Sequence, residues 1–156
     1  MIVQSIMEAK VVTISNKTSL RDVWKLFTKT KFNAFPVVDK EHHLIGIVSK
    51  QDMLKLLYPN YRVYTSDIGI EEDTFEEDKE FASLMKRKVS GIMHRNIIYT
   101  HKLTSIMRAL GRMIAHSVNQ LPVVDDDNHV VGIITKGTIF SGLYRFHKAL
   151  FRKKSK

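Results

Sequence analysis

Apolar and polar positions in residues 32–58 predict two strands followed by a helix. Residues 35–38 and 44–48 are short apolar runs rich in β-branched side chains, which is typical of buried strands. Between these runs the chain is polar, and Asp39 suits the start of a tight turn. After the second run, the hydroxyl of Ser49 is expected to cap a helix. Apolar residues then recur at helical spacing: Met53, Leu54 and Leu57.

The same pattern occurs a second time in the chain. A shift of 86 residues places residues 32–58 on residues 118–144 without a gap. Positions that carry the same amino acid in both copies are Asn33, Pro36, Val37, Val38, Asp39, His43, Gly46, Ile47, Lys50, Leu57 and Tyr58. The chain is therefore interpreted as an internal duplication.

The duplication extends upstream of these strands. Residues 3–13 align with residues 89–99 under the same shift, and a short strand is expected at Val11 and Val12 and at their equivalents Ile97 and Ile98. Each copy then predicts an amphipathic helix that begins after a Ser or Thr cap. The caps and stripes are Thr18 or Ser19 before Leu20, Val23, Trp24 and Phe27, and Thr104 or Ser105 before Ile106, Ala109, Leu110, Met113 and Ile114. The predicted class is α+β, with a strand, a helix, two strands and a helix in each copy.

Four segments follow from the duplication: a first repeat over 1–58, a connection over 59–88, a second repeat over 89–144 and a basic extension over 145–156. The acidic part of the connection, residues 71–80, is expected to begin a solvated spacer helix that ends near Lys88, because acids early and bases late suit the helix dipole. The last helix of the second repeat is expected to continue past Tyr144. Its apolar stripe is Phe140, Leu143, Phe146, Leu150 and Phe151.

Composition narrows the class of protein. The chain has no cysteine, so it has neither a disulfide nor a thiolate metal site, and a reducing compartment suits it. No apolar run approaches the roughly 20 residues that span a bilayer, and the first ten residues do not resemble a signal peptide. We therefore expect a cytoplasmic protein that is not transmembrane. The formal charge of +9 suits contact with phosphates of a nucleotide, a nucleic acid or a membrane surface, or simply a solvated basic tail.

A strand with proline followed by VVD, a turn, a strand ending in GIVS and a helix, all present twice, resembles a tandem pair of cystathionine β-synthase (CBS) domains. The resemblance covers residues 3–144. It implies two βαββα units packed as a pseudo-twofold pair, with clefts between them that hold adenine nucleotides or related adenosyl ligands. It also implies a regulatory protein that performs no chemistry of its own and forms a homodimer.

The ligand motif of this family matches GIVSKQD, residues 46–52. By resemblance, Asp52 would bind the ribose hydroxyls, Ser49 would face the phosphates and Ile47 would offer apolar surface. The partner repeat would surround the base with Ile98, Val118 and Gln120. The chemistry is reasonable in itself, because a carboxylate accepts two hydroxyl hydrogens and its charge strengthens both bonds.

The second copy departs from the motif. It reads GIITKGT, so Ile133 and Thr135 are kept, but Thr138 stands where the carboxylate belongs. A neutral hydrogen bond is worth about 1 kcal/mol against about 1.5–3 kcal/mol for a charge-assisted one. The second cleft, with walls expected at Val12, Phe32 and Ala34, is therefore predicted to be weak, empty or differently selective.

Other candidate sites are less specific. Asp39, Glu41, His42 and His43, and likewise residues 125–129, resemble metal ligands, but both groups lie in expected hairpin turns where polar residues are common, so no metal site is predicted. A P-loop, a G-x-S-x-G elbow and an H-E-x-x-H helix are absent from the sequence, and no enzyme is predicted.

Two functions from different classes remain. The first is a regulatory sensor that needs no cofactor, binds AMP, ADP, ATP or S-adenosylmethionine, and signals through conformation or assembly to an unknown partner. The second is a nucleic-acid-binding or scaffold protein that uses the CBS pair as a dimer platform and the basic tail as its contact.

Overall fold

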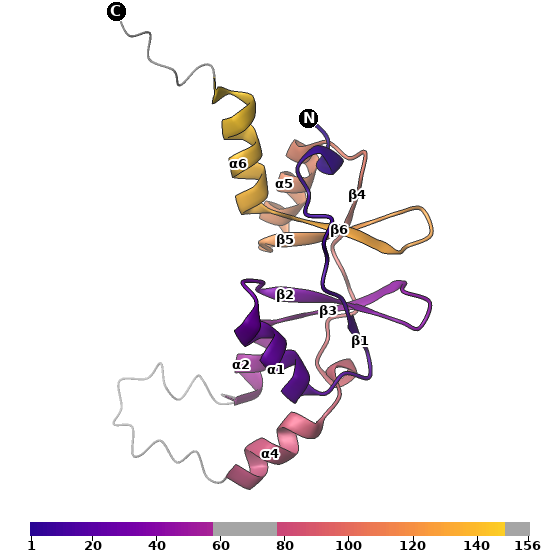
Figure 1. The fold of residues 1–156 in the computed structure, drawn as a ribbon, viewed down its shortest axis with the longest axis vertical. Helices are drawn as coiled ribbons and strands as arrows, with labels where there is room; N and C mark the ends of the chain where they lie inside the picture. Colours follow the sequence, from indigo (N-terminus) through magenta and orange to yellow (C-terminus); the bar gives the residue numbers. More distant parts are fainter. Residues whose placement is uncertain (58–77, 149–156) are drawn as a thin grey trace, which may run out of the picture. The chain divides into compact units, whose positions relative to one another are not determined.

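A computed structural model describes residues 1–57 and 78–148 of the chain. Within these ranges each copy forms the predicted βαββα unit (Figure 1). The elements of the first copy are β1 (Ile14–Ser15), α1 (Leu20–Lys29), β2 (Ala34–Val38), β3 (Leu44–Ser49) and α2 (Lys50–Leu57). Those of the second are β4 (Thr100–His101), α5 (Ile106–Ala115), β5 (Gln120–Val124), β6 (Val130–Thr135) and α6 (Lys136–Phe146). Further elements are the short 3-10 helices η1 (Val3–Ser5) and η2 (Val89–Gly91) and the helix α4 (Asp78–Lys86).

Two three-stranded sheets carry the architecture, ordered β1-β2-β3 and β4-β5-β6. The first strand of each sheet runs parallel to the central strand, with Ile14 beside Val37 and Thr100 beside Val123. Every residue of β2 is buried, whereas burial alternates along β3. This is the pattern expected of a central strand that is covered on both faces beside a strand that is half covered.

The chain divides into two compact units that do not follow the order of the repeats. The first unit comprises residues 13–41 and 45–96, and the second comprises residues 1–12, 42–44 and 97 onward. The start of each copy thus contributes to the unit that holds the sheet of the other copy. In the second unit Val3 is fully buried and belongs to the core. In the first unit the equivalent Val89 is also fully buried.

The position predicted for the first strand of each copy was wrong by about three residues. Strands form at Ile14–Ser15 and Thr100–His101 rather than at Val11 and Ile97. The parallel register with Val37 and Val38, and with Val123 and Val124, determines where pairing occurs. Local β propensity is weaker than this tertiary constraint.

Helix α1 begins as predicted, because Ser19 accepts a hydrogen bond from the backbone N–H of Asp22. Its stripe of Leu20, Val23 and Phe27 is buried. In α5 the stripe is narrower than predicted, since Ile114 is 63% exposed while Ile106, Ala109 and Met113 are buried. Ile114 thus lies on the solvent-exposed face of α5, and the opposite face packs against the core.

The interpretation of the connection as a solvated spacer helix was wrong for the part that the structure describes. Helix α4 packs against α1, and the ring of Phe81 meets that of Trp24 edge-on at 6.0 Å. Met85, one turn later, is buried. Phe81 and Met85 are four residues apart and therefore lie on the same face of the helix. The acidic residues 71–77 lie outside the described residues.

The last helix continues past Tyr144, as predicted, but it ends at Phe146, before the last two residues of the predicted stripe. Leu143 packs on the core of the second unit, but Phe140 and Phe146 are exposed, so only part of the predicted stripe contacts the module. Leu150, Phe151 and the rest of the basic tail from residue 149 lie outside the described residues.

Thr100 offers a direct test of the core of the second unit. Its side chain is fully buried, and among the described residues its hydroxyl has no hydrogen-bond partner. The equivalent residue of the first copy is the apolar Ile14. Because a buried hydroxyl without a partner costs about 1–3 kcal/mol, Thr100→Val is expected to stabilise the protein by about 1 kcal/mol.

Urea denaturation measures this gain as a higher midpoint at an unchanged slope. The control is Thr135→Val, which removes a hydroxyl that caps α6 and is expected to destabilise. A lower midpoint for Thr100→Val would show that the Thr100 hydroxyl has a stabilising partner.

Candidate functional site

The motif at residues 46–52 spans the end of β3 and the first turn of α2. Gly46 is required there by packing. A Cβ at this position would lie 2.6 Å from the sulfur of Met93, which covers the strand. Gly132 in the second copy is covered in the same way by Met7, at 2.7 Å. The two glycines of the duplicated motif therefore make room for the segment that begins the other copy.

Asp52 and Ser49 form a reciprocal cap at the start of α2. Asp52 Oδ2 accepts hydrogen bonds from the backbone N–H of Ser49 at 2.7 Å and from its hydroxyl at 2.6 Å. In return, the Ser49 hydroxyl oxygen accepts the backbone N–H of Asp52 at 3.2 Å. The arrangement is a capping box. It fixes the carboxylate, whose side chain is only 10% exposed.

His94 is the second partner of this carboxylate. Its Nε2 lies 2.8 Å from Asp52 Oδ1, and its side chain is 63% exposed. Paired backbone hydrogen bonds between His94 and Ile47, at 2.9 and 3.0 Å, place the imidazole beside the start of α2. The sequence analysis did not identify His94, because 42 residues separate it from Asp52. The available signal was its position directly after Met93 in the aligned segment.

The second copy keeps the cap but changes its chemistry. Thr138 Oγ1 accepts the backbone N–H of Thr135 at 2.9 Å and donates to the Thr135 carbonyl at 3.0 Å. Thr135 Oγ1 accepts the backbone N–H of Thr138 at 3.0 Å. The only hydrogen of the Thr138 hydroxyl is thus already used within the helix turn. Its oxygen also accepts the Thr135 hydroxyl at 3.4 Å. Thr138, which carries no charge, is therefore a poor acceptor for a diol.

Comparison with known proteins identifies the fold family. The CBS domain model matches residues 3–59 and 89–145, one match for each copy. The chain belongs to the CBS domain family. An uncharacterized protein of Methanocaldococcus jannaschii, MJ1426, is 30% identical over 156 residues, which cover 92% of this chain and 91% of that protein.

A solved CBS domain pair supports the same conclusion. The structure is that of the CBS domain pair of protein MJ0100 in complex with 5′-methylthioadenosine and S-adenosyl-L-methionine. It is 25% identical, covers 94% of this chain and 97% of that chain, and superposes with a TM-score of 0.71. Other CBS relatives are longer. L-aspartate semialdehyde sulfurtransferase of M. jannaschii is 26% identical over 88% of this chain, which spans only 22% of that enzyme.

The remaining predicted site residues lie in both units. Ile47, with Ser49 and Asp52, belongs to the first unit, as do Phe32 and the buried Ala34. In the second unit, Ile98 and Val118 pack against the core and Gln120 pairs with Thr135. Val12 and the buried Ile133 also belong to the second unit. Each CBS repeat therefore places its motif residues, Ser49 with Asp52 or Thr135 with Thr138, at the start of a helix. Whether the remaining predicted residues complete a ligand site with them stays a prediction.

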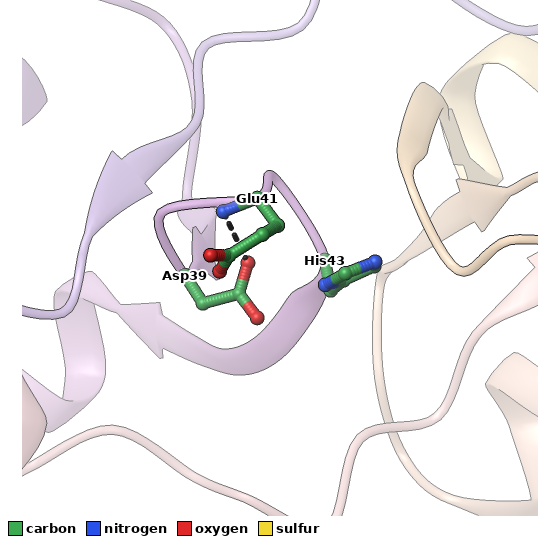
Figure 2. A group of neighbouring side chains, drawn as sticks. All are labelled: Asp39, Glu41 and His43. Carbon is green, nitrogen blue, oxygen red and sulfur yellow. Dashed lines mark hydrogen bonds between the residues drawn. The ribbon is translucent and has the colours of Figure 1, made fainter.

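The hairpin turn of the first CBS repeat gathers Asp39, Glu41 and His43 (Figure 2). One possible ligand atom from each lies within 4.8 Å of the others. Asp39 Oδ1 accepts the backbone N–H of Glu41 at 3.0 Å, so the carboxylate closes the turn. In the equivalent turn, the backbone N–H of His129 donates to Asp125 and lowers the pKa of that carboxyl below its ordinary value. Both groups thus have the role in turn formation that the sequence predicted.

The surface of the described residues is hollowed along α1 and α2 and, separately, beside β4. One hollow, of about 290 Å³, lies along α1 and α2 and is lined by apolar side chains together with Thr28 and Lys50. The Lys50 Nζ is 5.9 Å from the centroid of the Phe27 ring. The other, of about 340 Å³, is lined by Ile97, Ile98, Tyr99, His101, Arg112 and His116. An Arg112 nitrogen donates to the Tyr99 carbonyl at 2.7 Å. The sequence analysis did not identify this second, basic hollow, because its residues come from separated elements.

Proposed function

We propose that the chain is a regulatory module that binds an adenine nucleotide or another adenosyl compound through Asp52. The observation that carries the proposal is the state of this carboxylate, which is held rigidly at the start of α2 and largely shielded from water. A fixed carboxylate binds the two adjacent hydroxyls of a ribose without further ordering of the protein. The ligands of the related MJ0100 pair contain such a ribose and support the assignment.

The proposed ligands are AMP, ADP, ATP and S-adenosylmethionine. Ile47 and Ser49 line the same site in this proposal, and Ile98, Val118 and Gln120 contact the base. In the second CBS repeat, Thr135 and Thr138 with Ile133, Val12, Phe32 and Ala34 form a weaker site. Binding acts as a signal only if the ligand has different affinities for two arrangements of the protein. Neither a cofactor nor catalysis is required for this role.

A homodimer in the cytoplasm is part of the proposal. Met53 on α2 and Ile139 on α6 are buried within their own units and are not available for such an interface. Other apolar side chains are exposed on the helices of the second unit: Met107 and Ile114 on α5, and Phe140 and Tyr144 on α6. Single exposed apolar residues are ordinary, but four on two neighbouring helices suit an interface between subunits. No helix among the described residues is long and apolar enough to cross a membrane.

Calorimetric titration of the purified chain with AMP, ADP, ATP and S-adenosylmethionine tests the proposal. We expect one site per chain for at least one of these compounds, and a dimer by light scattering. Heat or thermal shift with none of them would contradict the sensor. The alternative, nucleic-acid binding through the basic tail, predicts instead an affinity for DNA or RNA that falls steeply with salt. Removal of residues 149–156 would abolish such binding.

A further inference from the structure

The proposed ligand carboxylate is already occupied by a group of the protein. An ionised carboxylate offers about four acceptor positions, two on each oxygen. In Asp52 both positions of Oδ2 are filled by Ser49, and one position of Oδ1 faces His94 at 2.8 Å. A single position is left. A ribose diol that donates two hydrogen bonds needs two, so one of the present donors must leave when the ligand binds.

The two present donors differ in how firmly they are held. The bonds from Ser49 belong to the helix cap, and their loss would expose the start of α2 at a cost of about 1 kcal/mol. The imidazole of His94 is mostly exposed, so water replaces Asp52 as its partner at little cost. His94 is therefore the donor that leaves. The backbone bonds of His94 to Ile47 remain when the side chain leaves, so the segment stays on β3.

We propose that His94 is an internal competitor of the ribose for Asp52, and that ligand binding releases the His94 side chain from the start of α2. The inference rests on the proposed function and adds to it a residue that sets the affinity. It also provides a signal. The ligand would break the side-chain hydrogen bond between Asp52 of α2 and His94 of the segment that precedes the second sheet. Ligand binding would thereby change a contact made by the start of the second repeat.

The second copy supplies a natural comparison. The residue equivalent to His94 is Glu8, which forms the same paired backbone bonds with Ile133, at 2.9 Å each. Glu8 is exposed, and the residue equivalent to Asp52 in this copy is Thr138. An ionised carboxylate only accepts hydrogen bonds, so Glu8 cannot occupy an acceptor position of Thr138 as His94 occupies one of Asp52. The competition is thus confined to the first copy, and Glu8→Ala is a matched control at the same backbone position.

Titration of His94→Ala with the adenosyl compound that binds the wild-type chain tests the inference. We expect about two- to tenfold tighter binding, the factor that corresponds to the net free energy of one hydrogen bond. His94→Gln keeps a side-chain N–H donor and is expected to retain an affinity close to wild type. Glu8→Ala should change nothing. His94 is exposed, so these variants are expected to fold, and the melting temperature without ligand checks this.

Each result of the titration has a distinct meaning. Equal or weaker binding by His94→Ala, with the wild type binding normally, overturns the competition while the sensor function stands. Tighter binding by His94→Ala and His94→Gln alike also overturns it, because the donor would then be irrelevant. If wild type and all variants fail to bind every compound, the proposed function fails, and this inference fails with it.

Discussion

Replacing Asp52 with alanine is expected to weaken binding of the adenosyl ligand at least tenfold, which corresponds to about 1.4 kcal/mol. The carboxylate would be the only charged acceptor for the ribose in the first copy, and its removal leaves two hydroxyls of the ligand without their partner. The dissociation constants of wild type and Asp52→Ala, measured by calorimetry, give the effect. An unchanged constant would place the ligand elsewhere.

Asp52 also stabilises α2, so the variant needs a control that loses only a helix cap. Asp22 provides it. Its Oδ2 accepts the hydroxyl of Ser19 at 2.7 Å, and its backbone N–H donates to that hydroxyl at 3.2 Å, against 2.6 and 3.2 Å for Asp52 and Ser49. Asp22→Ala should lower the melting temperature and leave the ligand affinity unchanged. Thr138→Ala should likewise have little effect on ligand binding.

Deleting residues 1–8 is expected to destabilise the second unit by about 3 kcal/mol or more. The deletion removes the buried Val3, worth about 1.5–3 kcal/mol. It also removes backbone hydrogen bonds of about 1 kcal/mol each. These include the bond from Val3 to the Thr104 carbonyl and the pair between Glu8 and Ile133, all at 2.9 Å. It uncovers Gly132 as well, which Met7 now covers.

Hydrogen exchange locates this effect within the chain. Amides of residues 97–146 are expected to exchange faster in the deletion variant, while those of 13–41 change less. A matched pair of milder variants separates the two units further. Val3→Ala should increase exchange in the second unit, and Val89→Ala in the first, since both valines are fully buried at equivalent positions. Faster exchange of residues 13–41 after loss of Val3 would contradict the division into units.

The sequence was sufficient to predict most elements of the fold because their causes are local. The short apolar runs that contain Pro36 and Pro122, each followed by a polar turn, identified the hairpins. The periodicity after Ser19 and Ser105 identified α1 and α5. The positions of β1 and β4 were predicted wrongly because each strand is only two residues long, too short for a clear sequence pattern. Their position depends on pairing with Val37 and Val123, which lie 23 residues further along.

The candidate site was predictable only as far as its motif is contiguous. Ser49 and Asp52 are three residues apart, so a helix start necessarily brings them together. The partnership of His94 with Asp52 depends on the exchange of segments between the two units, which no spacing in the sequence indicates. The packing of α4 on α1 was not predicted from the sequence for a similar reason. Phe81 and Trp24 are far apart in the sequence and become neighbours only in the fold.

The exchange of segments also has a consequence for synthesis on the ribosome. Residues 1–12 emerge first, yet β6 and α6, with which they form the second unit, are completed only at residues 135 and 146. At about 5–20 residues per second, this segment waits for roughly 7 to 27 s before its partners exist. The first unit is complete earlier, once residues 89–96 have left the exit tunnel. While residues 13–146 are synthesised, the apolar segment 1–12 therefore lacks the strand β6 and the helix α6 that later form its unit.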